Sequence, residues 1–244
     1  RYGTFQAIFG YGNVGSPDYF VSTTNLISST GSVSTDVTGV GFVRYALAAA
    51  SYGGDKAIFG YGYNGLSQGG ERNVTNLVSN TGVVASDTTG VGSQRYGLTA
   101  ASYGGDKAVF SHGQGSFGSY YNMTNLVSNT GVVASDTTGV GTARSTLAAA
   151  SYGGDKAIFG YGNINSQGSQ PRSMTNKVSN VGVVSADTTG VGTARYALAA
   201  ASYGGDKAIF GYGNTGSAYQ NVTNKVSNLG DVSTDTTGVG TARY

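Results

Sequence analysis

The stretch Tyr52-Gly-Gly-Asp-Lys-Ala-Ile-Phe-Gly-Tyr-Gly62 is the most insistently repeated part of this sequence. It returns almost unchanged at 103–113, 152–162 and 203–213, and a fainter copy covers residues 2–12. Copies about fifty residues apart indicate that one structural unit has been multiplied, which is typical of propellers and other repeat folds. The fold must therefore be derived from one unit.

Each unit contains four short apolar segments. In the second unit they are 46–51, 57–61, 75–80 and the part around Val83-Val84. Gly-Gly-Asp, a variable loop and Asn-Thr-Gly separate them, and Thr-Thr-Gly-Val-Gly follows the last one. Glycine-containing turns between β-prone runs predict hairpins, and four strands joined in this way form a propeller blade. The sequence therefore predicts an all-β fold, a five-bladed β-propeller of four-stranded antiparallel blades.

The composition of the segments predicts their places in a blade. The first segment is nearly all alanine, as expected of an innermost strand crowded against its neighbours near the axis. The second is apolar on both faces, which is typical of a strand sandwiched between blades. In the third, Val78 and its equivalents stay apolar, whereas the preceding residue is Leu77 or later Lys177, so the valine is predicted in the core. The fourth segment is expected at the outer edge.

The unit boundaries predict one propeller domain spanning residues 1–244. Its blade units cover approximately 1–43, 44–94, 95–143, 144–194 and 195–244. The alanine-rich segment occurs only four times, so the first blade is expected to lack its inner strand. We expect the chain to be a fragment, a processed chain or an excised domain, whose parent closes the ring with a further alanine-rich strand. An open ring and a parent with more blades are the alternatives.

The composition excludes several classes of protein. The 244 residues include 42 glycines, no cysteine and 11% charged residues, with a net charge of +2. Without a basic block, nucleic-acid binding is not expected. Without cysteine, disulfides and thiolate metal sites are excluded. No hydrophobic run approaches the ~20 residues that a membrane-spanning helix needs.

The unit resembles the kelch repeat over essentially the whole chain. Thr193-Ala-Arg-Tyr196 stands where kelch blades carry an Arg-containing turn before the inner strand. Residues 52–62 match the kelch double glycine and the strand after it, and residues 76–84 match the third strand, turn and fourth strand. Valine replaces the usual fourth-strand tryptophan. The spacing also resembles regulator-of-chromosome-condensation repeats, and near-identical repeats of this composition resemble those of tailed-phage and viral surface proteins.

The loops between the second and third segments carry the variation among units. The kelch resemblance implies that these loops share a partner-binding face with the repeated arginine. Exposed aromatic and amide side chains on a rigid scaffold are a suitable contact surface. The predicted binding residues are Tyr19, Phe20, Arg44, Tyr63, Asn64, Arg95, Phe117, Tyr120, Tyr121, Arg144, Arg195, Tyr219 and Gln220.

Each of these features also has a structural explanation. Drift among copied loops would produce the same variation. The arginines can instead tie adjacent blades to carbonyl groups, because the guanidinium carries several donors. The aspartate before each Thr-Gly pair, such as Asp187, suits an Asx turn. His112, the only histidine, replaces a repeated tyrosine and has no fixed carboxylate or second histidine beside it. No metal or cofactor is expected.

These features favour a non-enzymatic ligand-binding propeller. The partner would be a glycan or a protein receptor, and the protein would lie outside the cell or on a virion surface. The alternative is a structural protein–protein interaction scaffold of the kelch type, whose loops contact other subunits of a fibre or virion. An enzyme is not expected, because near-identical repeats with one histidine and no cysteine supply no distinctive acid–base or nucleophile pair.

Overall fold

The computed structural model describes residues 5–15, 19–65, 69–165 and 169–244. These residues form five antiparallel sheets, which we number in chain order. Sheet 1 consists of β1 (Phe5–Asn13) and β2 (Phe20–Ser28). The other four sheets have three strands each. Sheet 2 consists of β3 (Ala48–Tyr52), β4 (Lys56–Gly60) and β5 (Thr75–Val78), and sheet 3 of β6 (Thr99–Tyr103), β7 (Lys107–Gln114) and β8 (Tyr120–Val127). Sheet 4 consists of β9 (Ala148–Tyr152), β10 (Lys156–Gly160) and β11 (Thr175–Val178), and sheet 5 of β12 (Ala199–Tyr203), β13 (Lys207–Gly211) and β14 (Thr223–Val226).

The repeated motif forms a tight hairpin followed by the middle strand of a sheet. Gly53 and Gly54 have φ angles of 61° and 81°, a conformation that glycine adopts without steric cost. The turn sets Tyr52 opposite Lys56 and Ala50 opposite Ile58. Asp55 and Lys56 form a partly exposed ion pair beside this turn, which confirms the predicted solvated hairpin tip.

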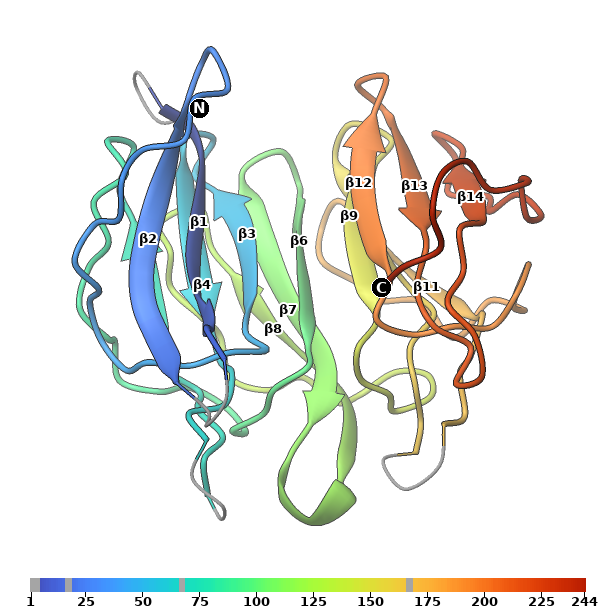
Figure 1. Ribbon diagram of the computed structural model, residues 1–244, viewed down its shortest axis with the longest axis horizontal. Helices are drawn as coiled ribbons and strands as arrows, with labels where there is room; N and C mark the ends of the chain where they lie inside the picture. Colours follow the sequence, from blue (N-terminus) through green and yellow to red (C-terminus); the bar gives the residue numbers. More distant parts are fainter. Residues whose placement is uncertain (1–4, 16–18, 66–68, 166–168) are drawn as a thin grey trace.

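The alanine-rich strands are the innermost ones, as predicted. Figure 1 shows β3, β6, β9 and β12 in the middle of the molecule, with sheet 1 at the left and sheet 5 at the right. In β6, β9 and β12, a serine at the same position links the strand to the inner strand before it. Ser102 donates its hydroxyl to the Ser51 carbonyl, and Ser151 does the same to Ser102, each at 2.8 Å. Only small side chains leave room for strands to approach this closely.

The hydrophobic core lies between consecutive sheets. Between sheets 2 and 3, Tyr52, Ile58 and Tyr61 pack against Phe110 and Val127. Equivalent residues fill the junction between sheets 3 and 4 and the junction between sheets 4 and 5. Both faces of the middle strands β4, β7 and β10 are therefore buried, which explains why residues 57–61 are apolar without alternation.

The outer part of each unit follows the prediction only in part. Val78, Val127, Val178 and Val226 are fully buried, while Leu77 and Lys177 are partly exposed, as the alternation predicts. The fourth segment, however, is not a regular strand. It meets the third strand through single bridges such as Val78 to Val84, supported by a few backbone hydrogen bonds. Beyond that bridge, Ala85–Gly92 contains a glycine pair that favours turns over strand.

The arrangement is all-β and propeller-like, and no sheet of the described residues closes on itself. Sheet 1 has two strands there, as expected from the missing alanine-rich segment. One face of sheet 5 is also uncovered: Tyr203 is 39% exposed, whereas Tyr52, Tyr103 and Tyr152 are each 3% exposed. The described residues include no helix that is long and apolar enough to cross a bilayer.

Candidate functional site

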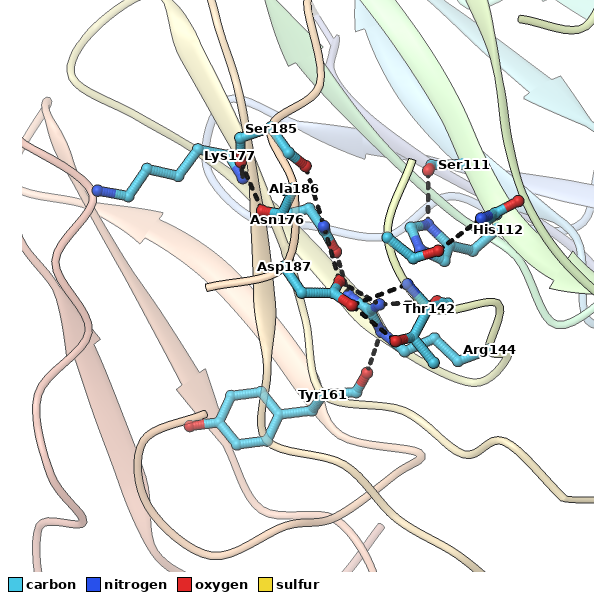
Figure 2. A network of polar contacts seen from close by, with 12 residues as sticks. Ser111, His112, Thr142, Arg144, Tyr161, Asn176, Lys177, Ser185, Ala186 and Asp187 are labelled. Carbon is cyan, nitrogen blue, oxygen red and sulfur yellow. Dashed lines mark hydrogen bonds and ion pairs between the residues drawn. The ribbon is translucent and has the colours of Figure 1, made fainter. Parts of the chain in front are cut away.

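The repeated arginines are buried and hold each unit together. Figure 2 shows the third of these networks along the chain, around Arg144. Its guanidinium donates to the Tyr161 carbonyl at 2.8 Å, to the side-chain oxygen of Asn176, and to Asp187 at 3.4 Å. Asp187 also accepts from the backbone N–H of Thr142 at 2.8 Å. The network thus fastens the outer segment of a unit to the segment that leads into its inner strand.

The charges of this network are matched. Partial burial raises the pKa of Asp187, but hydrogen bonds from Thr142 and Asn176 outweigh it and hold the pKa below its usual range. Burial lowers the pKa of Arg144 to about 10, which still leaves the guanidinium charged at neutral pH. A buried charge needs such partners, because an unpaired one costs several kcal/mol.

This geometry corrects two sequence-based predictions. Arg44, Arg95, Arg144 and Arg195 are 0% exposed, so they do not belong to a surface that a ligand could touch. They tie parts of the fold together, which was the alternative explanation. The repeated aspartates do not form Asx turns with their own neighbours either. Asp87, Asp136, Asp187 and Asp235 accept a backbone N–H from a residue more than forty positions away.

A tyrosine of the preceding unit stacks on most of these arginines. Arg95 lies 4.2 Å from the ring centre of Tyr61, and Arg195 lies 4.3 Å from that of Tyr161. Burial raises the pKa of Tyr61 to about 12, so its hydroxyl stays protonated and donates to the Val91 carbonyl at 3.3 Å. The junction between consecutive sheets therefore combines a cation–π contact with a hydrogen bond.

Among the variable loops, those of the first three units surround a row of aromatic rings. Phe20 stacks on Tyr45 with ring centres 4.8 Å apart, Tyr45 meets Tyr63 edge-on at 5.8 Å, and Tyr63 meets Tyr96 at 5.0 Å. We call these four residues the aromatic row. It crosses from sheet 1 to sheet 3, so its shape depends on how the units are placed side by side.

A cavity of about 180 Å³ adjoins the aromatic row. Tyr63 and Tyr96 line one part of it, and Glu71 and the 115–118 loop line the rest. Phe117, in the single turn of 3-10 helix Ser116–Gly118, is 94% exposed and has a φ of 57°. Buried structural residues such as Tyr61 and Tyr161 share this left-handed conformation, so it is the exposure of its ring that distinguishes Phe117. The cavity therefore joins flat aromatic surfaces to one acidic residue.

The other predicted loop residues lie outside this cavity. Tyr19 is exposed, and Tyr121 packs against Gly115, where an added Cβ would be 2.8 Å from the ring. Tyr219 stacks on Tyr244 with ring centres 4.9 Å apart, far along the chain from the aromatic row. The remaining predicted residues, Asn64, Tyr120 and Gln220, are partly buried. The structure brings together Phe20, Tyr63 and Phe117 of the predicted set, with Tyr63 shared by row and cavity.

The sequence-based prediction missed Tyr45, Tyr96 and Glu71. A signal for the two tyrosines was present, because each directly follows the repeated arginine in the sequence. Their neighbour Arg44 or Arg95 points into the core, and alternation along an extended segment then turns the tyrosine toward the other side. Glu71 occurs in one unit only, and no repeated pattern marks it.

Shallow grooves also recur at the outer rim between consecutive sheets. They have volumes of about 190 to 270 Å³ and are lined by equivalent threonines, valines and a turn glycine. In the largest, the hydroxyls of Thr75 and Thr88 bond each other at 2.7 Å. Their polar groups are thus already engaged, and the grooves offer little beyond apolar contact.

Acid–base and metal chemistry have little support in the described parts of the chain. They contain no group of three or more histidine, aspartate or glutamate side chains that could hold a metal ion. Burial, with the nearby charge of Arg144, lowers the pKa of His112 well below its usual value. Its Nδ1 lies 2.7 Å from the Ser111 hydroxyl inside the core, and His112 does not line the cavity beside the aromatic row. We therefore treat His112 as a core residue.

Comparison with known proteins supports the fold class alone. No family model matches the chain, and no curated protein matches it either. A solved structure described as "Structure of YjhT" is similar, with a TM-score of 0.68 and 10% sequence identity. The similarity covers 94% of this chain and 80% of that one. At this level of identity the match carries information about the fold and none about the ligand.

Proposed function

We propose that the chain is a non-enzymatic, kelch-like propeller whose five sheets are its blades, and that it binds a glycan or a surface receptor through the aromatic row and the cavity beside it. The observation that carries this proposal is the exposed ring of Phe117 at a cavity lined by two tyrosines and a glutamate. Flat aromatic faces pack against the apolar faces of sugar rings, and a carboxylate accepts hydrogen bonds from hydroxyls.

The position of the cavity supports binding over drift. Almost every other part of the unit is copied, and its polar groups serve the fold, as the arginine networks show. The cavity instead combines two features that occur once, Glu71 and the 115–118 loop with its 3-10 turn. We further propose an extracellular or virion-surface location, where such a module would meet glycans and receptors.

A glycan array followed by titration of any hit tests this function. Phe117→Ala should weaken binding of that ligand about five- to thirtyfold, since an aromatic contact with its buried area contributes about 1–2 kcal/mol. The exposed side chain makes this variant unlike a core mutation, so its melting temperature should stay within about 2 °C of that of the parent chain.

Tyr203→Ala is the matched control. Tyr203 is also an exposed aromatic residue, but it lies on the uncovered face of sheet 5. Its loss should leave ligand affinity unchanged. Equal effects of the two substitutions, or an array and a cell-surface screen without any hit, would remove the proposal.

A protein–protein scaffold is the second candidate, and the outer rim favours it. Val83, Val132 and Val183 occupy equivalent positions in the fourth segments, and each is about two-thirds exposed, at 66%, 66% and 65%. A repeated row of apolar side chains could contact another subunit. Light scattering coupled to size-exclusion chromatography separates the candidates, because a strictly monomeric chain over a wide concentration range argues against self-assembly through this rim.

A further inference from the structure

The middle strand of sheet 1 has an edge that the middle strands of the other sheets do not have. β4, β7, β10 and β13 each pair with a strand on both sides, whereas β1 pairs only with β2 among the described residues. The backbone N–H and C=O groups on its other edge therefore meet no described strand between Ala7 and Gly10. An open edge of this kind is a template for pairing with another chain segment.

The adjacent inner strand, β3, has unmatched groups on the same side. Ser102, Ser151 and Ser202 each donate their hydroxyl to the serine carbonyl of the preceding inner strand at 2.8 Å. Ser51 is the first member of this series, and its exposed hydroxyl has no such carbonyl among the described residues.

The backbone residues just before the inner strands form a second series of hydrogen bonds, which also lacks its first member. Gly97 donates its N–H to the Ala46 carbonyl, Thr146 donates to Gly97, and Ala197 donates to Thr146, at 2.7 to 2.9 Å. The N–H of Ala46 has no equivalent acceptor in the described residues. Two independent series of hydrogen bonds thus lack their first member at the same place, beside β3 and the free edge of β1. We call this place the seam.

Packing at this seam also has room for a strand. Ile58 and Ile158 are fully buried, whereas the equivalent Ile8 is only partly buried although it packs against sheet 2. At the other junctions, a tyrosine at the end of the inner strand covers a turn glycine. An added Cβ would lie 3.0, 3.0 and 2.8 Å from the nearest tyrosine atom at Gly131, Gly182 and Gly230. At Gly82 the three nearest atoms all belong to Leu26.

We propose that the free edge of β1, together with β3, is a docking site for an extended peptide segment of the kind that forms the chain's own inner strands, such as Thr-Leu-Ala-Ala-Ala-Ser-Tyr-Gly-Gly of residues 146–154. The register follows from β3 and β4, in which Ala48, Ala49, Ala50 and Ser51 face Gly60, Phe59, Ile58 and Ala57. The segment therefore runs antiparallel to β1, with its three alanines opposite Gly10, Phe9 and Ile8 and its serine opposite Ala7.

This register satisfies the unmatched groups together. The serine carbonyl of the segment accepts from the Ser51 hydroxyl, and the carbonyl of the residue before its leucine accepts from the N–H of Ala46, as the Ala46 carbonyl accepts from Gly97. Its tyrosine covers Gly82 and Leu26, as Tyr52 covers Gly131. Main-chain bonds supply affinity in this mode of recognition, and the side-chain spaces supply specificity. Only small residues fit opposite Phe9 and Ile8, because the segment must also lie beside β3. The site is independent of the aromatic row.

The experiment uses the 244-residue chain and a labelled synthetic peptide with the sequence of residues 146–155, Thr-Leu-Ala-Ala-Ala-Ser-Tyr-Gly-Gly-Asp. We expect saturable binding by fluorescence anisotropy and a melting temperature that rises with peptide concentration, since the peptide binds the folded state. A control peptide carries proline at the positions of Ala149 and Ala150. Neighbouring residues of a strand point their N–H groups to opposite sides, so one proline always removes a donor to β1, and this peptide should not bind.

Two chain variants locate the site. Ser51→Ala should weaken the peptide about three- to tenfold, the effect of one hydrogen bond, without loss of any bond within the chain. Ser202→Ala is the matched control: it removes an existing bond to Ser151 in sheet 5 and should leave peptide affinity unchanged. No binding at millimolar peptide, equal binding of the proline peptide, or equal effects of the two serine variants would overturn the proposal.

Discussion

His112 stands where the other four units place a tyrosine, and this exchange costs the fold two interactions. Tyr161 donates its hydroxyl to the Val191 carbonyl at 3.2 Å, and its ring supports Arg195 at 4.3 Å. Among the described residues, His112 makes no hydrogen bond to the equivalent carbonyl and no cation–π contact with the equivalent arginine. Its Nε2 is buried without a hydrogen-bond partner. The unit therefore departs from its siblings at a buried position.

Replacing this histidine with the repeated tyrosine should stabilise the protein. His112→Tyr restores a hydrogen bond and a cation–π contact with Arg144 and removes an unsatisfied nitrogen, so we expect a gain of about 1–2 kcal/mol. Urea unfolding at pH 7.5 measures it. Tyr161→Phe is the control and should lose about 1 kcal/mol, because it deletes only the hydroxyl bond. A His112→Tyr variant less stable than the parent would show that the junction has adapted to histidine.

The same residue should make stability depend on pH. Burial and the charge of Arg144 lower the pKa of folded His112 well below 6.5, whereas in the unfolded chain it titrates near 6.5. Above that value both states are neutral and stability is unaffected. As pH falls below about 6.5, the unfolded chain binds a proton that the folded chain does not, so stability falls by at most about 1.4 kcal/mol per pH unit.

His112→Tyr tests this account, because it removes the group. The stability lost between pH 7.5 and pH 5.5, measured by urea unfolding, should be smaller in the variant than in the parent. Carboxylates titrate alike in both proteins and cancel in the comparison. Equal losses would contradict the assignment of the pH dependence to His112.

At the scale of the element, the middle strands β4, β10 and β13 each end on a glycine, and in β4 and β10 the next sheet packs against it. A Cβ at Gly60 would lie 2.6 Å from the ring of Phe110, which is fully buried and has no room to move. Gly211 occupies the same position in sheet 5, where the nearest atom is a methyl of Thr223 at 3.3 Å. Gly60→Ala should therefore cost about 1–3 kcal/mol, as overpacking of a core does.

Gly211→Ala serves as the paired variant, with an expected change within about 0.5 kcal/mol. Thermal unfolding of both variants against the parent decides the matter. Equal destabilisation by the two substitutions would mean that strand geometry demands this glycine, and that packing between sheets does not.

The elements also show how far sequence reasoning reaches. The alanine run, the Gly-Gly turn and the Val78 series each predicted one local structure correctly, because strand period and turn geometry are short-range properties. The fourth segment failed as a regular strand, since one bridge at Val84 holds it and side chains such as Asp87 fix the rest.

The candidate site was less accessible to prediction than the fold. Arg44 and its copies look like surface residues by composition, and only their distant partners among the aspartates show why they are buried. The aromatic row likewise joins Phe20 to Tyr96 across three units, a proximity that no local pattern contains.

At the scale of the whole molecule, the hydrophobic clusters of the described residues join sheets that are neighbours in the chain, so stability should vary along the array. Sheets 2, 3 and 4 are covered on both faces by adjoining sheets, whereas the described parts of sheets 1 and 5 each share one such junction. In an array of this kind, stability is roughly the sum of unit and nearest-neighbour terms, and the end units open first. Phe9, 60% exposed in sheet 1, and Tyr203 in sheet 5 mark the uncovered faces.

Hydrogen–deuterium exchange followed by mass spectrometry should resolve this gradient. We expect the amides of β6 and β7 to exchange slowest, and those of β1 and β12 to exchange at least tenfold faster, because one missing junction removes well over 1.4 kcal/mol of apolar burial. Addition of the inner-strand peptide should slow β1 and leave β12 unchanged, which separates docking at the seam from a general stabilisation. Uniform protection across all five sheets would instead show that the array unfolds as one cooperative unit, and that the uncovered faces of sheets 1 and 5 cost it little.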